Sequence, residues 1–280
     1  MRRAAFGPTG VHVPLIGQGT WNMEHDGRTR AVAALRAGLD AGMTHIDTAE
    51  MYGRGRVEEM VGEAIAGRRD EVFLVSKVLP SNATFAGVQR ACEASLARLH
   101  TDRLDVYLLH WPGRHPLEQT IAAFERLVDD GKIRAWGLSN FDVDELEQAL
   151  AIAGARRTAC NQVVYHLEER RIERAVLPWC ARHDVAVVGY SPFGSGSFPG
   201  PRTAGGRVLA EIARERGATP RQVALAFLVR QPGLFAIPKA SAAAHVTDNA
   251  AAGDLVLTAA EIRRLDAAFP VARGRGLPTL

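Results

Sequence analysis

The chain has 280 residues, of which 47% are hydrophobic and 23% are charged; this is an ordinary globular composition and excludes a largely disordered protein. The formal net charge is only +3, and the arginines are scattered along the chain, so we expect no nucleic-acid partner. No apolar run reaches the roughly 18 residues of a membrane span, and residues 1–10 lack the apolar core of a signal peptide. The sequence therefore predicts a cytoplasmic protein with no membrane partner.

Short apolar runs alternate with longer amphipathic segments from one end of the chain to the other, as in parallel strands covered by helices on both faces. A hairpin is predicted first, with its arms at residues 2–6 and 11–13 around a turn at Pro8-Thr9-Gly10. The eight predicted strands then span residues 13–17, 44–47, 72–77, 105–110, 134–139, 159–163, 185–190 and 234–238. The predicted helices span residues 29–41, 57–66, 84–99, 117–130, 143–153, 172–183, 208–216 and 220–230.

Eight strands that alternate with helices predict parallel βαβ units, which leaves a closed barrel or an open doubly wound sheet. An open Rossmann sheet needs the pattern G-x-G-x-x-G directly after its first strand. The run Gly17-Gln18-Gly19-Thr20-Trp21-Asn22 lacks the third glycine. We therefore predict an α/β protein with a single (β/α)8 domain, a TIM barrel, over residues 1–280 with an N-terminal β-hairpin.

Polar side chains stand at the ends of most predicted strands, and chemistry in a (β/α)8 barrel takes place at the C-terminal ends of the strands. Asp47 ends the second strand, Lys77 the third and His110 the fourth, and Tyr52 follows Asp47 on the adjoining loop. Alone, each has a plain structural explanation, such as a helix cap, a solvated strand end or a core histidine. Their common position at one mouth is what indicates a site. Other strand ends carry Ser139, Asn140, Gln162, Tyr190, Ser191 and Lys239.

These residue types suit acid catalysis on a carbonyl group. The pKa of a tyrosine is ordinarily near 10, and we expect the ammonium of Lys77 to lower the pKa of Tyr52. Asp47 would keep Lys77 charged, and a neutral His110 would donate a hydrogen bond to the carbonyl oxygen. Such a site polarises a C=O bond and protonates the forming alkoxide. It has no source of electrons, so a hydride-carrying cofactor is needed.

The sequence resembles the aldo-keto reductase family at motifs that run in family order from Gly17 to Asn249. The matching motifs are Ile46-Asp47-Thr48-Ala49-Glu50-Met51-Tyr52-Gly53, Val75-Ser76-Lys77, Leu108-Leu109-His110-Trp111-Pro112, Gly137-Leu138-Ser139-Asn140-Phe141, Asn161-Gln162, Tyr190-Ser191-Pro192 and Ile237-Pro238-Lys239. The resemblance implies an NADPH-dependent oxidoreductase that reduces small aldehydes, ketones or dicarbonyls to alcohols. Residues 237–249 and 276–280 look most like bacterial members that reduce methylglyoxal.

The same resemblance implies roles for individual residues. The catalytic tetrad would be Asp47, Tyr52, Lys77 and His110, with Tyr52 as the proton donor. The nicotinamide would stack on Tyr190. The implied cofactor contacts are Gly19, Thr20, Trp21, Asp47, Ser139, Asn140, Gln162, Tyr190, Ser191, Phe193, Lys239, Ser241, His245, Asp248 and Asn249. The implied substrate contacts are Trp21, Tyr52, His110 and Trp111.

The stretch that specifies the cofactor departs from the family pattern. Many members follow the lysine with serine and place arginine six residues later and glutamate nine residues later. This chain has Ala240, His245 and Asp248 at those positions. Arginine is a permanent cation that suits the 2′-phosphate of NADPH, whereas histidine is charged only near or below a pH of about 6.5. We therefore expect a weaker preference for NADPH than usual, with appreciable use of NADH.

Other classes of protein fit the sequence less well. A nicotinamide-binding sensor or scaffold with little turnover would not need the intact tetrad. A metal-dependent barrel hydrolase would need a cluster of ligands at the strand ends, and of the nine histidines only His110 clearly ends a predicted strand, so no metal is expected. No solenoid repeat or heptad pattern suggests a structural protein. The short loop after His110 and the short tail after Phe269 predict an open pocket, and we expect a monomer.

Overall fold

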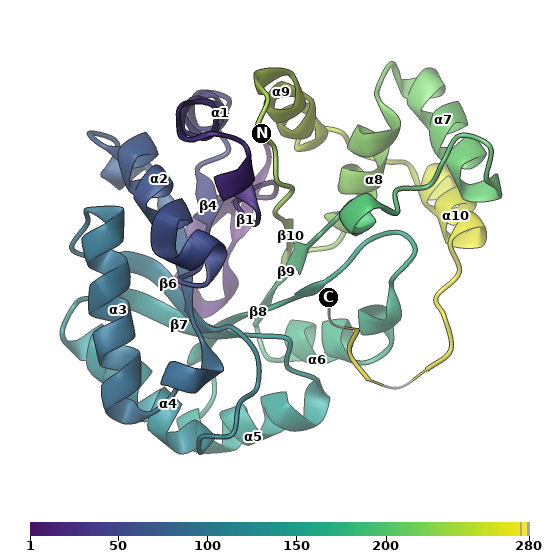
Figure 1. The fold of residues 1–280 in the computed structure, drawn as a ribbon. Helices are drawn as coiled ribbons and strands as arrows, with labels where there is room; N and C mark the ends of the chain where they lie inside the picture. The colour runs from purple at the N-terminus through teal and green to yellow at the C-terminus, as the bar shows by residue number, and fades with distance from the viewer. Residues whose placement is uncertain (275, 279–280) are drawn as a thin grey trace.

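The computed structural model describes residues 1–274 and 276–278 (Figure 1). The remaining residues, 275 and 279–280, lie outside the described part of the chain. The resemblance noted for residues 276–280 therefore falls partly outside the described residues, at 279–280.

Eight parallel strands form one curled sheet in the order β10-β9-β8-β7-β6-β5-β4-β3. Their bounds are β3 Gln18–Gly19, β4 His45–Asp47, β5 Phe73–Val78, β6 Leu104–Leu109, β7 Ile133–Ser139, β8 Thr158–Val164, β9 Ala186–Tyr190 and β10 Leu234–Ala236. Backbone hydrogen bonds join the two edges of this sheet, because Gly17 N–H donates to the Ala236 carbonyl (2.8 Å) and Ala236 N–H donates to the Leu15 carbonyl (2.9 Å). The prediction of a (β/α)8 barrel is confirmed.

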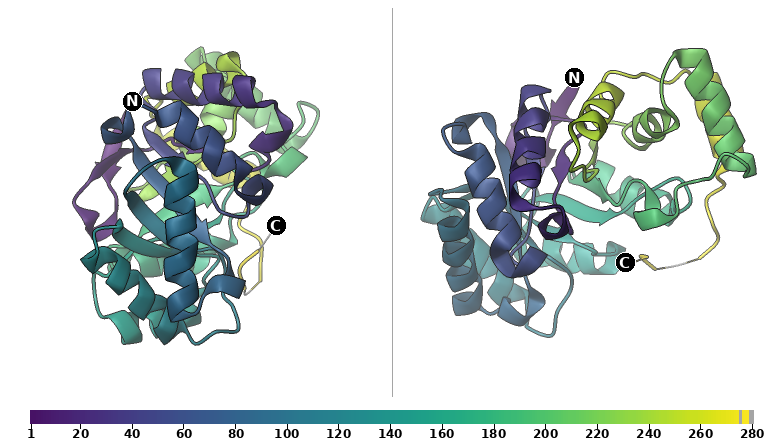
Figure 2. Two further views of the ribbon diagram at one scale, coloured as in Figure 1. Left: turned by 60° about the vertical axis from the view of Figure 1, so that its left-hand side comes forward. Right: turned by 45° about the horizontal axis from the view of Figure 1, so that its top comes forward.

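Helices surround the barrel on the outside, as Figures 1 and 2 show. Their bounds are α1 Arg28–Asp40, α2 Arg56–Ile65, α3 Phe85–Leu99, α4 Leu117–Asp129, α5 Val143–Ala153, α6 Val176–Arg182, α7 Ala204–Arg216, α8 Pro220–Leu228, α9 Ala243–Ala252 and α10 Ala259–Ala268. Several begin at a strong cap: Asp142 and Glu145 form a capping box at α5, and Thr219 and Gln222 form one at α8. These caps fix the residue at which each helix begins after the preceding loop.

The N-terminal hairpin covers the bottom of the barrel. Strands β1 (Arg3–Ala5) and β2 (His12–Pro14) pair in antiparallel fashion. Phe6 follows β1 and is fully buried, with its ring 4.8 Å from that of Phe73 and 5.0 Å from that of Phe235. The predicted barrel strand at residues 13–17 was wrong in its boundaries. His12–Pro14 pairs with β1, Ile16 forms a parallel bridge to Ala236, and β3 itself spans Gln18–Gly19.

Four helical segments differ from the sequence prediction. The predicted helix at residues 172–183 is a 3-10 turn, Arg171–Arg174, followed by the short helix α6. Helix α7 begins four residues earlier than predicted, at Ala204, because the Thr203 side chain accepts a hydrogen bond from Gly206 N–H and caps it. Helices α9 and α10 were not predicted. Helix α9 packs between α1 and α8, and it carries His245 and Asp248 of the cofactor-specifying stretch.

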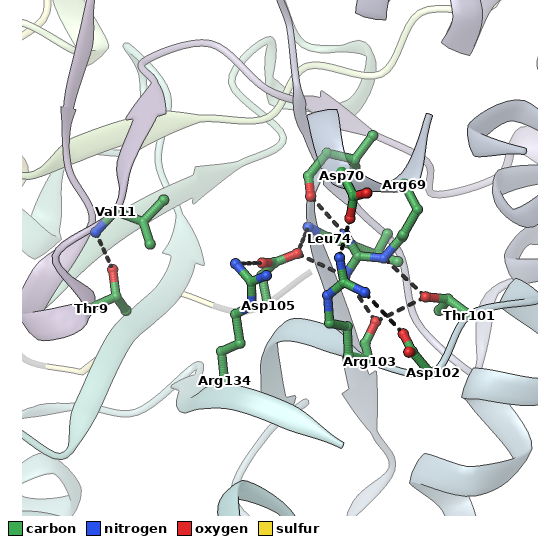
Figure 3. Close-up of polar contacts among 11 residues, drawn as sticks. Thr9, Val11, Arg69, Asp70, Leu74, Thr101, Asp102, Arg103, Asp105 and Arg134 are labelled. Atoms are coloured by element: carbon green, nitrogen blue, oxygen red, sulfur yellow. Dashed lines mark hydrogen bonds and ion pairs between the residues drawn. The ribbon is translucent and has the colours of Figure 1, made fainter. Parts of the chain in front are cut away.

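A buried carboxylate ties three strands together at the end of the barrel opposite the predicted site (Figure 3). Asp105, on β6, is 3% exposed. Its Oδ2 accepts from Arg69 Nη2 and from Leu74 N–H, both at 2.9 Å, and its Oδ1 pairs with Arg134 Nη1 at 3.1 Å. Because chemistry in this fold takes place at the other end, this cluster serves stability.

We expect Asp105→Ala to lower the free energy of unfolding by about 3 kcal/mol, because it leaves the part-buried Arg69 without its carboxylate. Denaturant unfolding followed by circular dichroism measures this change. Asp102→Ala is the matched control, since Asp102 makes an exposed ion pair with Arg103 and its loss should have little effect. A loss at Asp105 no larger than the loss at Asp102 would show that the buried cluster does not stabilise the barrel.

Candidate active site

The four residues of the predicted tetrad meet at the C-terminal mouth of the barrel, around the ammonium group of Lys77. Lys77 is fully buried. Its Nζ donates to Asp47 Oδ1 at 2.5 Å, to the Thr48 carbonyl at 2.8 Å and to Tyr52 Oη at 3.3 Å. The ring of Tyr52 meets that of His110 edge to face, with 5.7 Å between centroids. One cation therefore holds a carboxylate on one side and a phenol on the other.

The parallel register of the barrel explains this convergence. Asp47 ends β4 and Lys77 lies near the end of β5, so their side chains lie at the same edge of the sheet. Tyr52 begins a short 3-10 turn, Tyr52–Gly55, in which Gly53 and Arg54 have φ values of 56° and 57°. This left-handed turn favours glycine at position 53 and folds the chain back directly after Tyr52.

Burial controls the charge state of the tetrad. Burial alone would lower the pKa of Lys77, but the charge of Asp47 and the Tyr52 hydroxyl outweigh it, so the pKa is raised and the ammonium stays charged. Burial also raises the pKa of Tyr52 above its ordinary value, although Lys77 opposes this. Lys77 acts on the pKa of Tyr52 in the expected, lowering direction, but desolvation of the phenolate is the larger effect, so the net shift is upward. Tyr52 carries its proton at neutral pH.

His110 is electrically neutral at the same mouth. Burial, with a smaller contribution from Lys77, lowers the pKa of His110 to about 2. Its Nδ1 is buried and has no hydrogen-bond partner among the described residues. A neutral imidazole beside the Tyr52 ring can donate or accept a hydrogen bond at a substrate oxygen without competing for the proton of Tyr52.

Amide and hydroxyl groups from β7 to β9 continue the site. Asn140 Nδ2 donates to the His110 carbonyl (3.1 Å) and to Ser139 Oγ (3.2 Å). The Tyr190 hydroxyl donates to Asn140 Oδ1 at 2.9 Å. Gln162 Nε2 donates to Asp47 Oδ2 at 2.7 Å, so Asp47 is held from both sides. These bonds hold the predicted nicotinamide contacts in one layer next to the tetrad.

The opening segment of the barrel, Gly19 to Trp21, lies at the same mouth. A side chain at Gly19 would collide with the Ile237 carbonyl, so glycine is required where this strand passes the last one. Thr20 Oγ1 donates to the Asp47 carbonyl at 2.9 Å. Trp21 is exposed, as expected of a side chain at the rim.

The predicted phosphate end of the cofactor site lies where β10 leads into α9. Lys239 pairs in parallel register with Gly19, and its ammonium forms an ion pair with Asp26. The carbonyl of Ser241 accepts a hydrogen bond from Arg30 Nε at 2.9 Å. Helix α9 begins after Ala242 with no side-chain cap, so its first N–H groups have no side-chain acceptor. These donors suit the phosphates of a dinucleotide.

The remaining predicted cofactor contacts are more dispersed. The amide nitrogen of Asn249 is buried with no hydrogen-bond partner among the described residues, and such a donor fits a nucleobase acceptor. The carboxylate of Asp248 instead accepts from Thr219 Oγ1 at 3.1 and 3.2 Å. His245 is exposed on the first turn of α9. On the loop after β9, Ser191 Oγ lies 3.4 Å from Ser195 Oγ, and the Phe193 ring packs against Phe198.

A hollow of about 800 Å³ adjoins the mouth of the barrel. It is lined by Met51, Trp111, Pro112, Asn140, Asp142, Asp144, Glu145 and Leu277. The tail returns to this mouth because Arg170 Nη1 donates to the Phe269 carbonyl (2.6 Å) and Arg174 Nη2 donates to the Val271 carbonyl (3.1 Å). The tail therefore contributes Leu277 to the wall of this hollow, and the expectation of an open pocket stays a prediction.

Sequence reasoning missed several residues that the structure places here. Met51 could have been found, since it directly precedes Tyr52 within the family motif. Asp26, Arg30 and Leu277 carry no sequence signal of their own, because each reaches the site through tertiary packing. Across residues 1–274 and 276–278, no three His, Cys, Asp or Glu side chains are grouped so that they could hold a metal ion. No helix in the same part of the chain is long and apolar enough to cross a bilayer.

Comparison with known proteins shows the family of the chain. Residues 15–269 match the aldo/keto reductase family, and the chain belongs to that family of NAD(P)H-dependent oxidoreductases. It is 46% identical over 267 residues to the methylglyoxal reductase YeaE of Escherichia coli (strain K12), covering 95% of this chain and 94% of that protein. It is 33% identical to the glyoxal reductase of Bacillus subtilis (strain 168), covering 92% and 90% of the two chains.

Solved structures give the same result. An aldo-keto reductase from Klebsiella pneumoniae, crystallised in complex with NADPH, superposes with a TM-score of 0.93 at 45% identity, covering 100% of both chains. The resemblance deduced from the sequence motifs is thus confirmed.

Proposed function

We propose that this protein reduces small aldehydes, ketones and dicarbonyls such as methylglyoxal to alcohols, with NADPH as the hydride source. The observation that carries the proposal is the contact of the buried Lys77 ammonium with both Asp47 and the Tyr52 hydroxyl. Further support comes from the methylglyoxal and glyoxal reductases among the relatives and from the related structure that contains NADPH.

In the proposed mechanism, the carbonyl oxygen of the substrate lies between Tyr52 and His110. NADPH, when bound, supplies the hydride that adds to the carbonyl carbon. Tyr52 donates its hydroxyl proton to the oxygen, which becomes the alcohol, and Lys77 stabilises the phenolate that this leaves. Asp47 holds Lys77 in place and keeps it charged. His110, being neutral, supports the oxygen by a hydrogen bond.

The cofactor would lie across the mouth from β7 to α9. Ser139, Asn140 and Gln162 would meet the carboxamide of the nicotinamide, and its ring would stack on Tyr190. The remaining proposed contacts are Gly19, Thr20, Trp21, Asp47, Ser191, Phe193, Lys239, Ser241, His245, Asp248 and Asn249. Among these, Asp248 has the weakest structural support, since its carboxylate already accepts from Thr219.

The substrate would enter between two exposed indole rings. Trp21 is 42% exposed and Trp111 is 37% exposed, and the ring of Trp111 lies 4.8 Å from that of His110. The hollow is therefore apolar on the side of Trp111 and Met51, and acidic at Asp142 and Asp144. Such a wall favours uncharged carbonyl compounds over carboxylates.

The test is the loss of NADPH absorbance on addition of methylglyoxal or a simple aryl aldehyde, repeated with NADH. Turnover supports the proposal, and the ratio of the rates with the two cofactors measures the preference. If no carbonyl compound in a broad panel consumes either cofactor while NADPH still binds in a fluorescence titration, the protein is a nicotinamide-binding sensor and the proposal is wrong.

We also propose that the whole chain, residues 1–280, acts as one domain and as a monomer in the cytoplasm. The support is that all members of the proposed site come from a single chain and surround one barrel mouth. Light scattering on a size-exclusion column tests the monomer, and a dimer at assay concentration would contradict it.

A further inference from the structure

We propose that Arg30 supplies the fixed cation for the 2′-phosphate of NADPH, in place of the arginine that this chain lacks at position 245. The inference rests on the proposed use of NADPH and assigns a cofactor-specificity role to a residue outside the family motifs. It concerns the first turn of α1, which packs beside α9 (Figure 2).

The position of the Arg30 guanidinium carries the proposal. Arg30 Nε donates to the Ser241 carbonyl at 2.9 Å, so the side chain bridges from α1 to the loop between β10 and α9. This bond uses only the Nε–H group, and both Nη groups remain as donors. They lie next to Ser241, two residues after Lys239, in the stretch to which the phosphate is assigned.

The charge of Arg30 has no partner carboxylate among the residues that the structure describes. Its neighbour Arg28 pairs with Glu59 and Glu63, whereas Arg30 forms no ion pair with any carboxylate in the described part of the chain. An exposed arginine that bonds only a carbonyl keeps its full charge available for an anion. A guanidinium also matches phosphate geometry, because it can donate two parallel hydrogen bonds.

The other cations of this region do not replace it. The ammonium of Lys239 forms an ion pair with the carboxylate of Asp26, so the two together contribute little net charge. His245 occupies the position at which the family pattern noted in the sequence analysis has arginine, and histidine is not a permanent cation. Among the described residues, Arg221 on α8 also has no carboxylate partner, but its guanidinium lies over the rings of Phe193 and Phe198. Arg30 is bonded directly to Ser241, next to Lys239, and is therefore the better placed cation.

The test compares the dissociation constants of NADPH and NADH, measured by fluorescence titration, for the wild type and for Arg30→Gln. We expect Arg30→Gln to weaken NADPH about tenfold, as for the loss of a hydrogen bond between charged groups, with the affinity for NADH close to that of the wild type. Arg36→Gln is the matched control: Arg36 lies on the same helix but donates to the carbonyls of Glu63 and Ala64, away from this loop, and neither affinity should change.

A double variant tests whether the charge of Arg30, rather than its contact with the loop, binds the phosphate. Arg30→Gln/His245→Arg places a guanidinium on the first turn of α9, so it should bind NADPH several-fold tighter than Arg30→Gln does. The inference is overturned if Arg30→Gln binds NADPH as the wild type does, if it loses NADH equally, or if the double variant binds NADPH no tighter than the single one. A wild type that binds neither cofactor would instead overturn the proposed function itself, and this inference with it.

Discussion

Replacing Tyr52 with phenylalanine should lower the turnover of a carbonyl substrate by about 10²- to 10⁴-fold, the usual contribution of a general acid. The hydroxyl is the only group removed, and the ring still packs against His110 and under Lys77. The affinity for NADPH should therefore stay close to that of the wild type. Steady-state rates with methylglyoxal and a fluorescence titration with NADPH measure the two quantities separately. Near-normal turnover in this variant would show that another group donates the proton.

The pH dependence of the reaction tests the same assignment in the wild type. Burial is the main reason why the pKa of Tyr52 is raised, so the protonated form that reduction requires is present from neutral to mildly alkaline pH. Reduction should be nearly independent of pH over that range and fall only at more alkaline pH, where Tyr52 loses its proton. Oxidation of the alcohol needs the phenolate, so its rate should rise across the same range. A reduction rate that falls steeply just above neutral pH contradicts a buried, protonated tyrosine.

The register of a parallel barrel made much of this site predictable from the sequence. Asp47, Lys77 and His110 recur at intervals of about one βα unit, and parallel strands bring such positions to a single edge. Their meeting around one ammonium follows from the spacing. The net direction of the pKa shift at Tyr52 does not, because the sequence shows that a lysine is near but not how completely both side chains are buried.

Features that depend on packing between distant elements could not be predicted. Helix α9 was missed because its buried residues, Val246, Asn249, Ala250 and Ala252, form no strong apolar stripe. Because the sequence did not predict helix α9, nothing indicated that α1 packs beside it or that Arg30 reaches Ser241. The first barrel strand was misplaced for a related reason, since Val13 suits a hairpin as well as a barrel strand and only its pairing with Ala4 decides between them.

Lys77→Met should abolish most of the turnover and also lower the free energy of unfolding by about 3–5 kcal/mol, because the buried carboxylate of Asp47 loses its partner. The change keeps most of the apolar stem of the side chain and removes the charge with its N–H donors to Asp47, Thr48 and Tyr52. Turnover falls because nothing then stabilises the phenolate of Tyr52. Denaturant unfolding and steady-state kinetics measure the two effects on the same preparations.

The double variant Asp47→Asn/Lys77→Met separates stability from catalysis. An asparagine without charge can still accept from Gln162, so the double variant should regain much of the stability lost in Lys77→Met. Its turnover should stay as low as that of the single variant, because the ammonium beside Tyr52 is still missing. If the double variant is as unstable as Lys77→Met, the loss of stability in Lys77→Met does not come from an unpaired Asp47. If turnover returns with stability, Lys77 acts on the fold rather than on the proton of Tyr52.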